Sequence, residues 1–135
     1  MSMMTDNLTP SALSQFYGTE GYTWGPFRKF AMTDGVTYLC GNGAAWFVDL
    51  IASHQSKARA KLEEFQNWTL KPLNEPNMMA VATCDDGNGN VVITQKIEYT
   101  DFPFDRFPAG LNVYVVLGSL NGKDASWIAL LPSEY

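Results

Sequence analysis

One apolar helix followed by five strand-like segments constrains the fold of this chain more than any other feature. Residues 44–53 read Ala-Ala-Trp-Phe-Val-Asp-Leu-Ile-Ala-Ser, which is apolar around almost the whole helical wheel, so the helix must be buried on most sides. Asp49 marks the only face that could meet water. The segments that follow are rich in β-branched and aromatic residues and are bounded by turn formers. They cover residues 65–70, 78–84, 91–99, 111–117 and 125–131.

Turn-forming residues predict how the chain connects its strands. Asp34-Gly35 lies between residues 27–33 and 36–40 and predicts a two-residue hairpin, because both central positions of a type I′ turn need positive φ. The glycine and asparagine residues at 86–90 and 121–122 predict that the last four strands form an antiparallel meander.

The helical segments are fewer than the strands. Thr9-Pro10 predicts a short helix that ends by Gly18, and residues 19–26 are predicted as a loop. Residues 56–65 predict a short surface helix or an extension of the apolar one. A parallel sheet would need a helix between most strands. The predicted fold class is therefore α+β, in which an antiparallel sheet (the N-terminal hairpin plus the C-terminal meander) packs against one largely buried helix, with a short N-terminal helix.

Length and charge limit the domain count and the classes of partner. The 135 residues predict a single domain, 1–135, with residues 1–7 disordered. A net charge of −5 repels a phosphate backbone, so no nucleic acid is expected as a partner. No stretch approaches the roughly 20 apolar residues of a membrane span, and there is no basic leader. We therefore expect a cytoplasmic protein with no membrane partner, and with Cys40 and Cys84 as reduced thiols.

Two motifs resemble ligand sites but depart from them at critical positions. Gly41-Asn42-Gly43 opens a helix as a dinucleotide-binding loop does, but Trp46 stands where the third glycine lets helix and strand approach. Residues 86–90 match the first ligands of a calcium loop, whereas Val91 and Ile97 replace its essential glycine and glutamate. We therefore predict no cofactor and no metal.

The candidate catalytic groups do not combine into a catalytic set. Cys40 near a helix N-terminus would be the best nucleophile, but the only histidine, His54, lies about 16 Å away along the helix at roughly 1.5 Å per residue. Hydrogen-bond reach is about 3 Å. Glu98 and Asp101 form an alternative carboxylate site for a ligand or a substrate. No catalytic residue is predicted, and the protein is expected not to be an enzyme.

The segment 101–110 is the candidate binding loop. Its two prolines and one glycine interrupt any strand, yet three of its residues are phenylalanines. Either these rings fold back to seal the core, or some of them project toward a partner. The predicted partner-binding residues are Phe102, Phe104, Asp105, Arg106 and Phe107.

Several short motifs, spread from about residue 13 to the end, resemble those of a small uncharacterised family of bacterial, plasmid and phage proteins. They are Gln15–Glu20, Thr33–Leu39 (Thr-Asp-Gly-Val-x-Tyr-Leu), Gly43–Trp46 (Gly-Ala-x-Trp), Phe65–Leu70, Tyr99–Pro103 (Tyr-Thr-Asp-Phe-Pro) and the terminal Leu130–Tyr135 (Leu-Leu-Pro-Ser-Glu-Tyr).

The resemblance implies an origin and no activity. Occurrence on mobile elements implies an accessory protein of a phage or plasmid. We expect it to act by binding a protein, for example one of a host defence system; the alternative is a small enzyme or ligand-binding domain with a carboxylate site at Glu98 and Asp101. The edge of the meander or the apolar helix could also support a homodimer.

Overall fold

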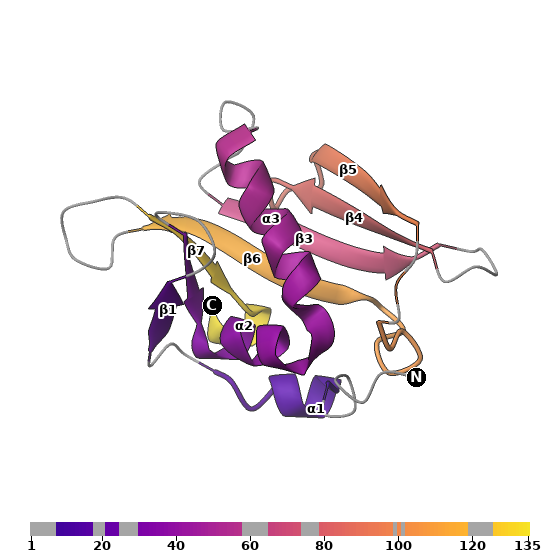
Figure 1. Ribbon diagram of the computed structural model, residues 1–135. Helices are drawn as coiled ribbons and strands as arrows, with labels where there is room; N and C mark the ends of the chain where they lie inside the picture. Colours follow the sequence, from indigo (N-terminus) through magenta and orange to yellow (C-terminus); the bar gives the residue numbers. More distant parts are fainter. Residues whose placement is uncertain are drawn as a thin grey trace.

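The computed structural model describes residues 8–17, 21–24, 30–57, 65–73, 79–98, 100, 102–118 and 126–135. It contains one seven-stranded sheet with helices α2 and α3 on one face and α1 near one end (Figure 1). The strands are β1 (Tyr22–Trp24), β2 (Phe30–Thr33), β3 (Phe65–Pro72), β4 (Ala80–Asp85), β5 (Val91–Ile97), β6 (Leu111–Gly118) and β7 (Ser126–Leu130). The helical elements are α1 (Pro10–Leu13), α2 (Asp34–Leu39), the π-type segment η2 (Cys40–Ala44), α3 (Ala45–Lys57) and the 3₁₀ turn η4 (Pro132–Glu134).

The strands pair in the order β1-β2-β7-β6-β3-β4-β5. Only β2 and β7 run parallel, and every other neighbouring pair is antiparallel. The α+β fold class is therefore confirmed. The predicted order of the last four strands is wrong, because β6 returns beside β3 and does not pair with β5. This return makes β3, β4, β5 and β6 a Greek key.

The hairpin turn predicted at Asp34-Gly35 is also wrong. These two residues open helix α2, and residues 36–40 form no strand. The Thr33 hydroxyl accepts a hydrogen bond from the backbone N–H of Val36 at 3.5 Å and caps the helix, and an acidic residue in the first turn is favourable there. A hairpin is present, but its two strands are β1, which lies in the predicted loop, and β2.

The other predicted helices are present with different ends. Thr9 caps α1 by accepting a hydrogen bond from the N–H of Ala12 at 3.1 Å, as its sequence predicts, but the helix ends at Leu13. Asn42 and Gly43, which has a φ of 99°, interrupt the helical path inside η2, between α2 and α3, and α3 continues to Lys57. The rest of the helix predicted over residues 56–65 and the disorder predicted for residues 1–7 lie outside the described residues.

Helix α3 lies across the sheet and supplies the centre of the core (Figure 1). Phe47, Val48 and Ile51 are completely buried, and each such side chain contributes about 1.5–3 kcal/mol relative to an exposed one. Asp49 is exposed, as the helical wheel predicts. The buried sheet side chains that share this core are Phe30, Met32, Trp68, Leu70, Ala80, Ala82, Cys84, Leu111, Val113, Val115 and Ala129.

A buried pair of glutamines joins α3 to β3. The amide of Gln55 donates to Gln66 Oε1 at 3.0 Å, and the amide of Gln66 donates back to Gln55 Oε1 at 2.9 Å. The Trp68 indole N–H donates to the same Gln66 oxygen at 2.8 Å. Because each amide satisfies the other, the polar groups can be buried without a large desolvation penalty.

The C-terminal turn η4 is fixed by the buried carboxylate of Glu134. Oε1 accepts hydrogen bonds from the Thr33 hydroxyl at 2.5 Å and from the N–H of Leu131 at 2.9 Å. Oε2 accepts one from the N–H of Gly35 at 3.1 Å. The carboxylate thus caps the N-terminus of α2 and ties the last residues of the chain to the start of that helix.

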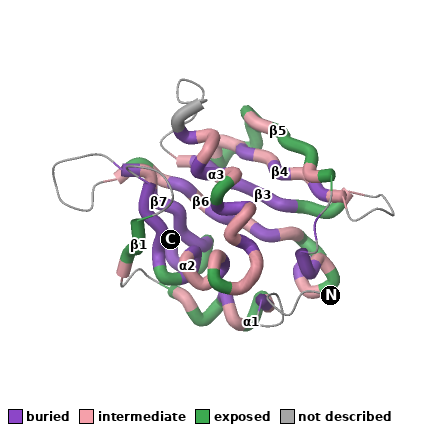
Figure 2. Tube along the Cα trace, viewed as in Figure 1, coloured by how far each residue is buried: buried purple, intermediate pink, exposed green. Residues whose placement is uncertain are grey.

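Burial decreases toward the two edges of the sheet (Figure 2). All three residues of β1 are exposed, and β5 is exposed along most of its length. The alternation of residues along β5 would place Val91 on the same face as Ile93 and Ile97, but its side chain is 56% exposed. A register shift between Cys84 and Asp85 places Val91 opposite Asp85, so the alternation does not continue to the start of β5.

Candidate functional site

The phenylalanines of the segment 102–110, here called the Phe-Pro loop, close the core. Phe102 and Phe107 are each only 5% exposed, and their ring centroids lie 5.2 Å apart. Phe104 is half-buried and packs against Phe102 at 4.9 Å. Of the two alternatives for these rings, the structure therefore supports core closure for Phe102 and Phe107.

The polar residues of the loop have different surroundings. Asp105 is exposed, whereas the guanidinium of Arg106 donates to the backbone carbonyl of Leu8 at 3.1 Å. This bond fixes the loop against the segment that precedes α1. Partner binding by the five predicted loop residues stays a prediction, and among them Asp105 is the exposed one.

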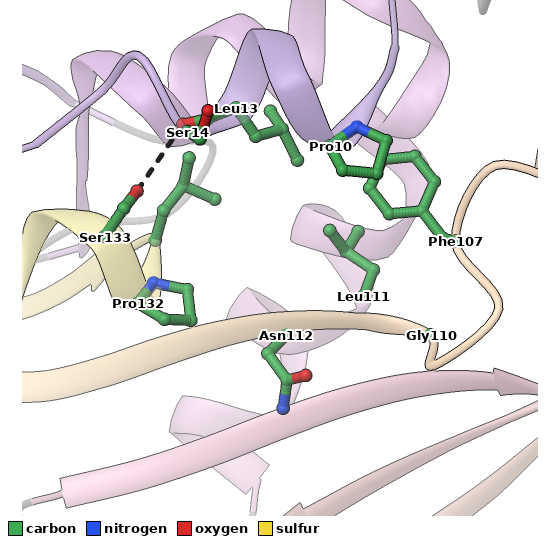
Figure 3. Close-up of a pocket in the computed structure, with 10 residues that line it drawn as sticks. Pro10, Leu13, Ser14, Phe107, Gly110, Leu111, Asn112, Pro132 and Ser133 are labelled. Carbon is green, nitrogen blue, oxygen red and sulfur yellow. Dashed lines mark hydrogen bonds between the residues drawn. The ribbon is translucent and has the colours of Figure 1, made fainter.

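The Phe-Pro loop borders a pocket that three other segments complete (Figure 3). The pocket lies between α1, the loop, the first residues of β6 and η4, and its volume is about 250 Å³. Leu111 points into it, whereas the Asn112 side chain points away toward β3 (Figure 3). We call this site the β6 pocket, and its lining residues are Pro10, Leu13, Ser14, Phe107, Gly110, Leu111, Asn112, Leu131, Pro132 and Ser133.

The β6 pocket lies beside the part of β6 that strand β7 does not reach. Strand β7 pairs with β6 only from Tyr114 to Gly118, so in the part of the chain that the structure describes Leu111–Val113 pair with β3 alone. After Leu130 the chain turns into η4, whose first residue, Pro132, has no N–H to continue a ladder. The first residues of β6 therefore keep one side free of a strand.

The lining has the chemistry of a binding surface. Six of the ten side chains are prolines, leucines or phenylalanine, and none of the ten is ionisable. The two serine hydroxyls donate to backbone carbonyls, Ser14 to that of Ser11 at 2.8 Å and Ser133 to that of Leu13 at 3.4 Å. A serine nucleophile needs an adjacent base, and the lining supplies none.

The open face of the sheet is less suited to binding a polar ligand. Its amides already pair along one row: Asn67 donates to Asp85 Oδ2 at 3.1 Å, and Asn112 donates to Asn67 Oδ1 at 2.9 Å. Asn112 also donates to the Thr69 hydroxyl at 3.0 Å. These side chains satisfy one another, and a ligand would have to displace bonds that already exist.

The alternative carboxylate site has little structural support. Glu98 is exposed at the end of β5, and Asp101 lies outside the described residues. In the described ranges, no group of three or more histidine, cysteine, aspartate or glutamate side chains could hold a metal ion. In the turn at residues 86–90, the Asp86 carboxylate already accepts hydrogen bonds from the backbone N–H groups of Asn88 and Asn90.

Neither cysteine has the surroundings of a nucleophile. Burial, with the nearby Asp49 charge, raises the pKa of Cys40 to about 11. Burial, with the charges of Asp85 and Asp86, raises that of Cys84 to about 12. Both thiols are free, and Cys40 lies at the end of α2, not at the helix start that would stabilise a thiolate.

The only histidine also has a structural environment. His54 Nε2 lies 2.8 Å from Gln95 Oε1 on β5, and its ring packs against Trp68 with centroids 5.5 Å apart. The sequence prediction that His54 is separated from Cys40 is consistent with their places at opposite ends of the η2–α3 segment.

Sequence reasoning missed the β6 pocket because its walls come from distant segments. Phe107 was singled out, but Leu13 and Leu111 carry no local signal that would bring them together. The end of β7 at Pro132 was the one available indication, since a proline interrupts pairing there.

Comparison with known proteins adds a family and no activity. No curated protein and no solved structure is significantly similar to the chain. Among the described residues, no helix is long and apolar enough to cross a membrane. Residues 7–135 match the family model described as "Family of unknown function (DUF6876)", and the chain belongs to that family.

Proposed function

We propose that this protein is a non-catalytic binding module that holds a partner protein through the β6 pocket. The observation that carries the proposal is an apolar pocket without an ionisable group among its ten lining residues. Its volume of about 250 Å³ is below the roughly 300–1,000 Å³ of typical small-molecule sites. A pocket of this size suits one or two side chains of a partner better than a whole cofactor.

The biological setting is proposed from the sequence resemblance. The resemblance implies an origin on a phage or plasmid, so we propose a bacterial host protein as the partner, such as a component of a defence system. The net charge of −5 supports a protein partner over a nucleic acid.

Affinity purification from lysate of a bacterial host, with and without phage infection, tests the proposal. Ser14 is exposed at the border of the pocket, and Ser14→Trp should occlude it. Ser11 is exposed on helix α1, which ends just before Ser14, and does not line the pocket, so Ser11→Trp is the matched control. We expect a stoichiometric partner that binds the wild type and Ser11→Trp and is lost with Ser14→Trp.

Two results would contradict the proposal. One is the recovery of no stoichiometric partner under either condition. The other is a partner that binds both tryptophan variants equally, because such a partner uses another surface. Circular dichroism should first show that both variants have the wild-type fold.

A further inference from the structure

We infer that two copies of this chain pair through their β5 strands, antiparallel and centred on Thr94, so that the two sheets become one. This inference does not depend on the proposed partner binding, because strands β3 and β4 separate β5 from β6 and its pocket. The homodimer expected at an edge of the sheet is thereby assigned to one strand and one register.

Strand β5 is an accessible edge of the sheet (Figure 1). Among the described residues it pairs with β4 alone, so alternate residues direct their N–H and C=O groups away from the sheet. Five of its seven residues are exposed, and the exposed fractions of Val91 and Val92 are 56% and 39%. The backbone groups of such an edge are available to another strand.

Strand β5 carries few of the features that keep a sheet edge from pairing. It contains no proline, and its only charged residue is Lys96. The register shift between Cys84 and Asp85 affects the start of β5 and leaves Ile93–Ile97 in regular pairing with β4. The opposite edge strand, β1, has only three residues, which itself limits pairing. Of the two edges, β5 is therefore the one that can hold a second strand.

A second copy of β5 suits this edge because the strand is complementary to itself. Two-fold symmetric pairing of antiparallel strands brings one residue opposite its own copy. With Thr94 in that place all seven residues are paired, and Val91 lies opposite Ile97 of the second copy at both ends. Any other centre leaves residues unpaired at the ends of the strands, and a centre at Lys96 would bring two like charges together, which is destabilising.

The side chains that flank the edge include opposite charges on one face of the sheet. Gln95 faces helix α3, since its Oε1 lies 2.8 Å from Nε2 of His54, so its neighbour Lys96 faces the side without helices. Asp85 faces that side too, because the preceding residue, Cys84, is buried in the core under α3.

Antiparallel pairing about Thr94 brings these charges toward each other. Lys96 of one copy lies opposite Val92 of the other, and Asp85 lies beside Val92 on the next strand. Two strand spacings, about 10 Å, separate the backbones of Lys96 and Asp85 of the second copy, a gap that the two side chains can bridge. The two-fold axis repeats this pair, and this charge complementarity favours a second copy as the occupant.

Sedimentation velocity from micromolar to near-millimolar protein concentration tests the inference. We expect a dimer with a Kd in the micromolar range, because pairing of one strand lies at the low end of interface sizes. Thr94→Lys places two lysines opposite each other and should weaken dimerisation at least about tenfold. Thr83 lies opposite Thr94 on β4, so Thr83→Lys adds the same charge one strand away and should weaken it by less than about twofold.

Two results of this experiment would overturn the inference. One is a wild type that stays monomeric over the whole concentration range. The other is a dimer that both lysine variants weaken equally, because such a dimer uses another surface. Circular dichroism should first show that both variants have the wild-type fold.

Oxidation of single-cysteine variants tests the register. In the paired strands the Cα atoms of Thr94 and its copy lie about 5 Å apart, whereas those of Val92 and its copy lie about 14 Å apart. A disulfide needs Cα atoms within about 7 Å. Thr94→Cys should therefore give a covalent dimer, and Val92→Cys and the wild type, with its two native cysteines, should not. Failure of Thr94→Cys to cross-link, or equal cross-linking of the two variants, would refute the register.

Hydrogen exchange on the unmodified protein avoids any effect of substitution on folding. The β5 amides that point away from β4 should become more protected as protein concentration rises, whereas the amides of the other edge, β1, should not. Unchanged exchange along β5 would contradict the inference. Ser14→Trp at the β6 pocket should leave the dimer intact, so failure of strand pairing and failure of the proposed partner binding are distinguishable.

Discussion

Replacement of Glu134 by glutamine should destabilise the protein far more than removal of an exposed acid at the same helix end. The carboxylate accepts three hydrogen bonds, two at Oε1 and one at Oε2. A glutamine can keep its oxygen at the Oε1 position, but its NH₂ group then faces the N–H of Gly35. One buried donor is left without an acceptor, which costs about 1–3 kcal/mol.

The lost negative charge adds to this cost. An acidic group at a helix N-terminus contributes about 0.3–1 kcal/mol when exposed and up to about 2 kcal/mol when partly buried. We therefore expect Glu134→Gln to lower the free energy of unfolding by about 2–4 kcal/mol. Asp34 is exposed in the first turn of the same helix, so Asp34→Asn removes the same charge without a buried hydrogen bond and should cost less than about 1 kcal/mol.

Urea unfolding followed by circular dichroism measures both values. The slope of the free energy against urea concentration should be unchanged, which shows that the same surface is exposed on unfolding. If Glu134→Gln is no less stable than Asp34→Asn, then the carboxylate does not hold the C-terminal turn, and this reasoning is wrong.

Three further predictions follow from buried groups and backbone geometry. In a double-mutant cycle by urea unfolding, Gln55→Leu and Gln66→Leu should each cost about 2–4 kcal/mol, and the double variant should cost clearly less than their sum. Because the pKa of Cys84 is raised to about 12, alkylation of Cys84 by iodoacetamide at pH 8 should be at least about a hundredfold slower in the folded than in the urea-unfolded protein, and equal rates would contradict this. The free energy of unfolding should also fall as the pH rises from about 9 toward 12, because the unfolded state loses the thiol proton first. Gly110 has a φ of 87° and an added Cβ would collide with a backbone oxygen, so Gly110→Ala should lower the melting temperature by several degrees, whereas Gly41→Ala, with open space, should not.

The elements that sequence predicted best are those with strong local patterns. The apolar helix and the five later strands are present within a few residues of their predicted ends, and the helix capped by Thr9 begins where predicted but ends five residues earlier than Gly18. Their type depends on periodicity and on capping, which are properties of neighbouring residues. The α+β class follows from the count and order of such elements.

The Asp34-Gly35 hairpin shows where local reasoning fails. The dipeptide alone favours a type I′ turn. The helix wins because Thr33 caps it and because Glu134, about a hundred residues away, accepts a hydrogen bond from Gly35. The residues around Asp34-Gly35 give no indication of a hydrogen-bond partner so distant in sequence. The pairing of β6 with β3 could not be predicted for the same reason, because it depends on contacts between segments far apart in the chain.

The C-terminal turn connects the stability of the fold with the candidate site. Glu134 holds η4 against the start of α2, and the preceding residues, Pro132 and Ser133, form one wall of the β6 pocket. The same turn ends the strand that would otherwise cover Leu111–Val113. Loosening η4 should therefore move one wall of the pocket. Glu134→Gln should reduce recovery of the partner protein in the affinity purification even where the protein remains folded, whereas Asp34→Asn should leave it unchanged. Affinity purification at a temperature well below both unfolding transitions separates these outcomes, and equal recovery would show that the turn and the pocket are independent.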